Sequence, residues 1–291
     1  MCDDSPLRRP EAGQPRGPKD RLREDELTAF SAGHAGIVRI PESATPGSPA
    51  PIIVVSPERY GLVQHTVDIA DRFAANGWAA ISPDFYAGIS ETEAGRLPGL
   101  SDARVMEHID AALTFLADDP RCDSARVVVF GVCRSGSWGL LASASHPEVV
   151  GVIMLYGGAQ PREFEINEDR DRPYANIIKS SAAPVLAIYG ERDHTMSVAD
   201  VTRVRGLFEE ARRTYRMSIV KDMPHGWLND TMPGRYYQDV AEATWTELLS
   251  FLNEVDPSSP TPPPAGPGQI TWEFRATIST DYDFSQNERH E

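Results

Sequence analysis

Cysteine is scarce in this chain, whose 291 residues include only Cys2, Cys122 and Cys133. A small, odd number of cysteines excludes the disulfide framework of small secreted domains and makes a reducing cytoplasm the expected compartment. No apolar run approaches the roughly 18 residues that a membrane-spanning helix needs. The first 26 residues are charged and rich in proline and glycine, without the apolar segment of a secretory signal. We therefore expect a cytoplasmic protein.

Positive charge is in the minority. The chain has 28 basic and 43 acidic residues, which gives a formal net charge of −15 at pH 7. An acidic surface repels phosphate backbones and anionic lipid, so we expect neither nucleic acid nor a membrane as a partner. Apolar residues make up 41% and charged residues 24%, as in an ordinary globular protein, and the length suits one large or two small α/β domains.

Composition divides the chain into three regions. Residues 1–26 are predicted to be a mobile N-terminal arm, because prolines alternate there with mixed charges. Residues 27–255 carry the apolar patterns of a folded domain. Residues 256–291 begin with a linker that has six prolines between positions 257 and 268, and end in a tail.

Short apolar runs alternate with helical patterns through the central region. The expected strands are Ile37–Ile40, Ile52–Ser56, Ala79–Ser82, Val127–Phe130, Val150–Tyr156, Val185–Tyr189 and Tyr215–Val220. Helical spacing of apolar residues appears from Val105 to Leu116 and from Val240 to Phe251. This order predicts an α/β fold, a three-layer sandwich of a mostly parallel sheet with helices on both faces.

The tail contains a second kind of pattern. From Ile270 to Ile278, apolar residues alternate with polar ones, which is typical of a strand with one buried face. Such a strand must pair with a sheet edge of its own subunit or of a neighbour, so a homodimer through this strand is one expectation. A disordered tail with a chance pattern is the alternative.

The segment Val127–Gly136 contains the most informative motif. An apolar strand runs into Gly131-Val132-Cys133-Arg134-Ser135-Gly136, which has small residues two before and two after Cys133. A nucleophile elbow has this strand–turn–helix order, and it would place the thiol at a helix N-terminus, where thiolate is favoured. Ser135 is a poorer candidate nucleophile because its small neighbours are out of register. A buried cysteine in an ordinary turn remains the alternative.

Two later strands end in residues that suit a cysteine nucleophile. Asp193 follows the strand at 185–189, and His225 follows the strand at 215–220. The order nucleophile, acid, histidine is that of α/β-hydrolase triads, in which histidine moves protons and the carboxylate fixes its tautomer. Taken singly, Asp193 is compatible with a helix cap and His225 with a turn.

With these motifs the sequence resembles the dienelactone hydrolases, α/β-hydrolases with a cysteine nucleophile. The likeness covers about Ile37 to Leu252. Its matching pieces are Val54–Gly61, Ser82–Tyr86, the Cys133 elbow, Gly190–His194 and His225–Asp230.

The resemblance implies roles for individual residues. It implies that Cys133, Asp193 and His225 form the triad, and that Glu58 contacts the resting thiol and helps to generate thiolate. By the same likeness, the backbone N–H groups of Arg134 and Arg59 would form the oxyanion hole.

Three aromatic residues near these motifs are candidates for the substrate pocket. They are Tyr60, Tyr86 and Trp227, and for Tyr86 and Trp227 packing in the core is the alternative.

The sequence departs from the family at two positions. Family members that act on dienelactone hold its carboxylate with two arginines, where this chain has Gly88 and Asn229. Arg59 or Arg96 could substitute for them, with a solvated or salt-bridging role as the alternative. Loss of bidentate carboxylate binding weakens affinity for an anionic lactone.

Together these features predict a hydrolase of a small-molecule ester or lactone that works through a Cys133 thioester, on a substrate other than the anionic dienelactone. No cofactor is expected, and the seven histidines show no metal-binding spacing. Two alternatives remain. One is a thioesterase or a lactone-forming or rearranging enzyme of secondary metabolism, and the other is a non-catalytic ligand-binding or scaffold protein.

Overall fold

Strands and helices alternate along the chain in the computed structural model, which describes residues 14, 16–31, 33–92, 97–256, 258 and 270–283. The strands are β1 (Thr28–Ser31), β2 (His34–Arg39), β3 (Ala50–Ser56), β4 (Ala79–Pro83), β5 (Cys122–Val132), β6 (Val149–Leu155), β7 (Val185–Gly190), β8 (Tyr215–Val220) and β9 (Trp272–Ala276). The α-helices are α1 (Gln64–Ala75), α2 (Asp102–Ala117), α3 (Trp138–Ser145), α4 (Tyr174–Ser180), α5 (Val198–Glu210) and α6 (Gln238–Val255). Short 3₁₀ turns are η1 (Glu24–Glu26), η2 (Cys133–Ser135) and η3 (Pro161–Phe164).

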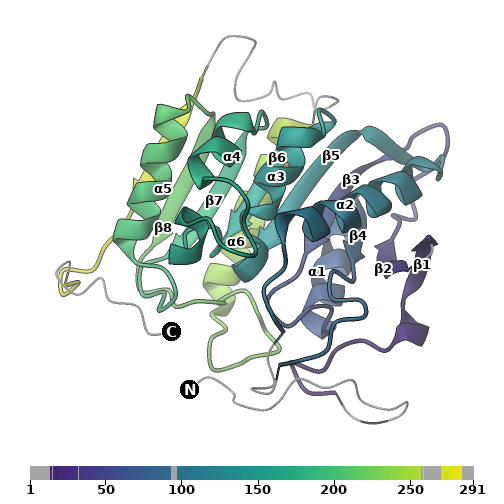
Figure 1. Cartoon of the computed structure of the whole chain (residues 1–291), viewed down its shortest axis with the longest axis horizontal. Helices are drawn as coiled ribbons and strands as arrows, with labels where there is room; N and C mark the ends of the chain where they lie inside the picture. The colour runs from purple at the N-terminus through teal and green to yellow at the C-terminus, as the bar shows by residue number, and fades with distance from the viewer. Residues whose placement is uncertain are drawn as a thin grey trace.

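One sheet contains all the strands named above, in the order β1-β2-β4-β3-β5-β6-β7-β8-β9 (Figure 1). Strand β2 is antiparallel to both β1 and β4, and every other neighbouring pair is parallel. The predicted mostly parallel sheet is therefore confirmed. Within the described ranges we find no helix whose length and apolar character would let it span a bilayer.

Helices cover both faces of the sheet, as strand β6 illustrates. A Cβ atom on Gly151 would lie 2.9 Å from Val255 of α6, whereas the next residue, Val152, packs against Gly139 of α3. Successive residues of a strand point to opposite faces, so α3 and α6 lie on opposite sides. Helix α1 packs beside α6 through Phe73 and Trp245, and α2, α4 and α5 continue the layer of α3.

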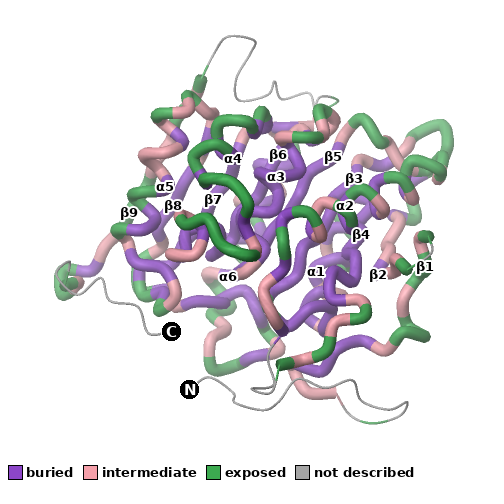
Figure 2. The backbone as a smooth tube through the Cα atoms, in the orientation of Figure 1, coloured by how far each residue is buried: buried purple, intermediate pink, exposed green. Residues whose placement is uncertain are grey.

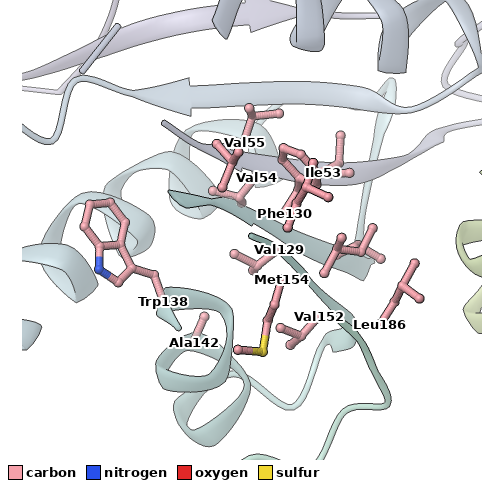
Figure 3. Packing of buried hydrophobic residues seen from close by; sticks show 14 of the residues in the cluster. Ile53, Val54, Val55, Val129, Phe130, Trp138, Ala142, Val152, Met154 and Leu186 are labelled. Carbon is pink, nitrogen blue, oxygen red and sulfur yellow. The ribbon is translucent and has the colours of Figure 1, made fainter. Parts of the chain in front are cut away.

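The central strands are buried on both faces, which explains their almost continuous apolar sequences (Figure 2). On one side of the sheet, Val129 of β5 and Val152 and Met154 of β6 lie near Ala142 of α3 (Figure 3). This packing holds the carboxyl ends of the parallel strands in fixed relation to one another.

The predicted N-terminal arm is wrong at its C-terminal end. Residues 19–22 are buried, and Arg21 forms a β-bridge with Val63. The Arg21 guanidinium lies 3.4 Å from the Asp84 carboxylate and donates a hydrogen bond to the carbonyl of Tyr86. A pairing with residues more than sixty positions away cannot be read from the local run of prolines and charges. Residues 1–13 and 15 lie outside the described residues.

The C-terminal strand forms, and its predicted apolar face is partly covered. Strand β9 pairs in parallel with β8 of the same chain, so 270–283 is not a disordered tail. Phe274 and Ile278 on that face pack against the core, whereas Trp272 is 50% exposed on this last strand of the sheet. Ser279 then donates hydrogen bonds to Glu191 and Asp222, which ties the tail to two loops at the carboxyl edge. Association of two copies through β9 stays a prediction, and the linker at 257 and 259–269 lies outside the described residues.

Candidate active site

The carboxyl ends of four parallel strands bring the predicted chemical groups together. Glu58 follows β3, Cys133 follows β5, Asp193 follows β7 and His225 follows β8. Ligands of open α/β sheets bind at this edge, because the loops that follow the strands converge there. Each of these four residues is at most 8% exposed.

Cys133 occupies a strained backbone position, with φ of 57°. For a non-glycine residue this left-handed region costs about 1–3 kcal/mol, and it is a mark of functional turns. The turn also brings backbone segments so close together that only glycine fits. A Cβ atom on Gly131 would lie 2.2 Å from the carbonyl oxygen of Ser135. A Cβ atom on Gly157 would lie 2.1 Å from the carbonyl oxygen of Cys133. These glycines allow the thiol to sit at the end of β5.

Ser135 holds the turn together. Its hydroxyl donates to the carbonyl of Ser56 on β3 and accepts from the backbone N–H of Val132, both at 2.9 Å. Both contacts are buried, so this hydroxyl fastens the elbow to the neighbouring strand.

A continuous chain of contacts links the thiol to a carboxylate. Cys133 Sγ lies 3.0 Å from His225 Nε2, and His225 Nδ1 lies 2.7 Å from Asp193 Oδ2. The other oxygen of Asp193 accepts 2.7 Å hydrogen bonds from the backbone N–H and the hydroxyl of Thr195. Thr195 thereby fixes the carboxylate plane. No motif in the sequence indicated Thr195.

The charges of Cys133, His225 and Asp193 stabilise one another. Burial would raise the pKa of the Cys133 thiol, but the charge and hydrogen bond of His225 outweigh it and lower that pKa. Burial would lower the pKa of His225, yet Asp193 and Cys133 raise it well above its usual value. Burial opposes ionisation of Asp193 too, but His225 holds its pKa below the usual range. The geometry therefore favours a thiolate–imidazolium pair, which is a nucleophile beside a proton donor.

Glu58 shares the sheet edge with the thiol, and its side chain is held by another residue. Its Oε2 accepts a 3.2 Å hydrogen bond from Asn229 Nδ2, whereas Oε1 is buried without a partner among the described residues. The Glu58 charge raises the pKa of Cys133. The Cys133 thiol is thus hydrogen-bonded to His225, whereas Glu58 affects the pKa of that thiol through its charge.

Comparison with known proteins adds an independent finding. The sequence profile of the dienelactone hydrolase family matches residues 35–256. The chain belongs to the dienelactone hydrolase family. It is therefore a hydrolase of ester or lactone bonds, and the resemblance seen in its motifs is confirmed.

Individual relatives of this hydrolase agree with that assignment. A protein of Methylorubrum extorquens named "Putative carboxymethylenebutenolidase" is 27% identical over 217 residues, covering 72% of this chain and 73% of the relative. The structure titled "Putative Dienelactone Hydrolase" from Klebsiella pneumoniae has a TM-score of 0.66 at 23% identity, covering 75% of this chain and 90% of that one. A dienelactone hydrolase-like promiscuous phosphotriesterase from metagenomic libraries has a TM-score of 0.59 at 18% identity, covering 77% and 99%. The two structures share the fold of this hydrolase.

The three predicted pocket aromatics of the hydrolase have different surroundings. Tyr86 is fully buried, and Cys133 and Arg134 are among the groups whose charges act on its hydroxyl. Tyr60 is 4% exposed, and its hydroxyl lies 3.4 Å from a guanidinium nitrogen of Arg235.

Trp227, by contrast, is a core residue. It is fully buried, donates its indole N–H to Thr244 of α6 and packs against Tyr156. Tyr156 lies between Trp227 and His225, with its ring centre 5.1 Å from that of His225. Trp227 thus packs against the ring that contacts the histidine, as its alternative role in the core predicts. No motif indicated Tyr156, because its position is set by the loop that follows β6.

Two of the arginines expected near the nucleophile use their side chains elsewhere. The Arg134 guanidinium donates to the carbonyl of Pro98, and the Arg59 guanidinium lies 5.3 Å from the centre of the Tyr60 ring. Arg96 lies outside the described residues.

The loop of the hydrolase at residues 159–173 carries many charged residues, and two of them are buried. Glu163 and Arg170 are buried and form an ion pair at 2.9 Å, and Arg170 also donates to Ser137 at the start of α3. These contacts fasten the loop over the elbow. Arg162, the residue before Glu163, contacts Gln160 and lowers the pKa of Cys133 through its charge. Burial of the Glu163–Arg170 ion pair depends on partners elsewhere in the chain, such as Ser137.

Proposed function

We propose that the protein hydrolyses a carboxylic ester or lactone through a covalent thioester on Cys133. The observation that carries this proposal is the chain Cys133–His225–Asp193, with contacts of 3.0 and 2.7 Å inside a buried site. The Cys133 thiolate attacks the carbonyl carbon, the ester C–O bond breaks, and the imidazolium of His225 protonates the leaving oxygen. His225 then takes a proton from water, which attacks the thioester, and the C–S bond breaks to release the acid and regenerate thiolate.

Several neighbouring groups support these steps. The backbone N–H groups of Arg134 and Arg59 are proposed to hold the oxyanion that forms during both attacks. Asp193 is proposed to keep His225 in the correct tautomer, and Tyr86, whose hydroxyl is affected by the charge of Cys133, is proposed as a pocket wall. Glu58 is proposed to restrain the thiolate until substrate arrives, because a nearby negative charge disfavours ionisation of sulfur.

The state of the thiol gives the test of this function. The thiolate reacts with iodoacetamide, so we expect the midpoint of the alkylation rate against pH to lie below the ordinary thiol value of about 8.5. Since the Glu58 charge raises the pKa of Cys133, Glu58→Gln is expected to lower the midpoint further. Mass spectrometry after rapid acid quench should show an acyl group on Cys133 during turnover of an activated ester. An ordinary thiol midpoint in the wild type, together with no acyl adduct, would refute the thioester mechanism.

We further propose that the substrate is a neutral ester or lactone. Gly88 and Asn229 stand where arginines would bind a carboxylate, and Asn229 donates to Glu58 instead. Two described arginines whose charges act on the site are already engaged, Arg134 by Pro98 and Arg162 by Gln160 and Glu163.

Comparison of paired substrates tests this second proposal. For a neutral lactone and a carboxylate-bearing analogue of the same ring, we expect kcat/KM to favour the neutral compound by about tenfold or more at low salt. Preference for the anionic compound that disappears in Arg162→Ala would contradict this expectation and place a carboxylate site at Arg162.

A further inference from the structure

Strand β9 is the last strand of the sheet, and no described segment pairs with its outer edge (Figure 2). On its inner side β9 pairs with β8, to which the carbonyl of Thr271 and the N–H of Thr277 are bonded. Backbone groups of successive residues in a strand point to opposite edges, so odd-numbered residues of β9 face β8 and even-numbered residues face outward. The N–H and C=O groups of Trp272, Phe274 and Ala276 therefore form an open edge, which is a template for a further strand.

The same strand leaves large apolar side chains exposed. Trp272 is 50% exposed and Ile270 is 44% exposed, and by alternation both lie on the face that carries Phe274 and Ile278. The Phe274 ring is covered by the guanidinium of Arg205 from α5, which lies 4.5 Å from the ring centre. Two neighbouring apolar side chains that the described elements leave uncovered, on a strand with an open edge, favour contact with another protein chain.

The sequence around this strand is nearly symmetric about Phe274. Positions at equal distances from Phe274 carry matching or complementary side chains: Ile270 and Ile278, Thr271 and Thr277, Trp272 and Ala276, and Glu273 and Arg275. When two identical strands pair antiparallel about one residue, such positions lie opposite each other. Glu273 then faces Arg275 of the partner subunit, and threonine faces threonine. Threonine pairs and opposite charges stabilise antiparallel neighbours, whereas opposed like charges destabilise them.

The hydrogen-bonding groups of the edge fit the same register. With the centre at Phe274, outward-facing residues lie opposite one another, and each such pair exchanges two hydrogen bonds. Glu273 and Arg275 of the partner subunit fall at a non-hydrogen-bonded position, where side chains are closest. A centre one residue earlier would oppose two copies of Glu273, and a centre one residue later would oppose two copies of Arg275. The charges therefore select the register centred on Phe274.

The charged face of β9 is also suited to this pairing. Glu273 contacts Arg216 of β8 and Arg275 within its own chain, and Arg216 forms an ion pair with Glu254 of α6. The Arg275 side chain is 70% exposed, so it can reach across the open edge. Acidic and basic groups thus alternate on this face, and a second copy adds to the network without opposing like charges.

We propose that the chain forms a homodimer in which two β9 strands pair antiparallel about a twofold axis at Phe274. The sheet of one subunit continues into the sheet of the other, and Trp272 is covered at the junction. The dimer does not depend on the thioester chemistry, so its failure would leave the proposed function untouched.

Sedimentation velocity of the full-length protein, at concentrations up to about 100 μM, tests the dimer. We expect the wild type to have twice the 32.0 kDa mass of one chain. Glu273→Arg opposes arginines at both charge pairs and Arg275→Glu opposes glutamates, so each variant alone should dimerise about tenfold or more weakly. In an equimolar mixture, the arginines of one variant face the glutamates of the other, and a heterodimer should form. Damage to β9 within one chain would persist in the mixture, so recovery identifies the interface.

Two further variants complete the design. Ala276→Pro removes an outward N–H and leaves the bonds to β8 in place, so it should give a single-chain mass. Arg39→Glu makes the same change of charge on β2, near the opposite end of the sheet, and should keep the dimer. Thermal unfolding and alkylation of Cys133 check that each variant is folded. Should Ala276→Pro unfold, the two charge variants and their mixture carry the test.

The contrary results are distinct. A single-chain mass for the wild type at every concentration would overturn the proposal. A dimer that survives both charge variants would place the contact on another surface, and a mixture that stays monomeric would show that the register is wrong. Assemblies that keep growing with concentration would indicate pairing of β9 with β1 at the opposite edge, which also contradicts a closed dimer.

Discussion

Cys133→Ala is expected to abolish turnover, lowering kcat by a factor of about 10⁴ or more, because the proposed thioester forms on the sulfur that this change removes. The fold should persist, since the change removes one sulfur atom and keeps a small side chain at the strained elbow. We expect the free energy of unfolding to change by less than about 1.5 kcal/mol. Initial rates with an activated aryl ester, together with thermal unfolding, measure both effects.

The second free cysteine in the described residues provides the control. Cys122 begins β5 at the opposite end of the strand, and burial raises the pKa of its thiol to about 11. Cys122→Ala should therefore leave turnover at the wild-type rate. Cys133→Ser is a finer probe, because a serine hydroxyl needs stronger base assistance than the thiol, and we expect its activity to lie far below that of the wild type. Wild-type activity in Cys133→Ala would eliminate the mechanism.

Asp193→Asn is expected to lower kcat by about 10²- to 10⁴-fold, for a reason visible in the hydrogen bonds. Asp193 Oδ1 accepts from the backbone N–H and the hydroxyl of Thr195, and Oδ2 faces His225 Nδ1. In the variant, the amide oxygen must stay with the Thr195 N–H, so the amide NH₂ turns toward His225. His225 then carries its proton on Nε2 and cannot accept one from the thiol.

The pH dependence of alkylation reports the same change. Asp193 raises the pKa of His225, and protonated His225 lowers that of Cys133. In Asp193→Asn the imidazolium loses its partner, so the midpoint of Cys133 alkylation should move to higher pH. Asp222→Asn, an exposed carboxylate on the neighbouring loop, should change neither quantity. A loss of less than threefold in Asp193→Asn would show that the carboxylate does not direct the histidine.

Local patterns determined the fold and the three strand ends that bear the predicted triad. The strands β3 to β8 could be predicted from their apolar runs because they are covered on both faces of the sheet. The nucleophile elbow could be predicted because the sharp turn at Cys133 needs small residues at fixed spacing. Asp193 and His225 could be grouped with it because parallel strands end at the same edge.

Tertiary structure alone decided which groups surround these residues. The bond from Asn229 to Glu58 joins residues 171 positions apart, and the ion pair from Arg21 to Asp84 joins residues 63 apart. Whether Trp272 is covered and whether Trp227 reaches the pocket depend on which elements pack beside them. A sequence pattern records the period and the chemistry of one segment. Burial and pairing are properties of two or more segments brought together, so they become visible only in the folded chain.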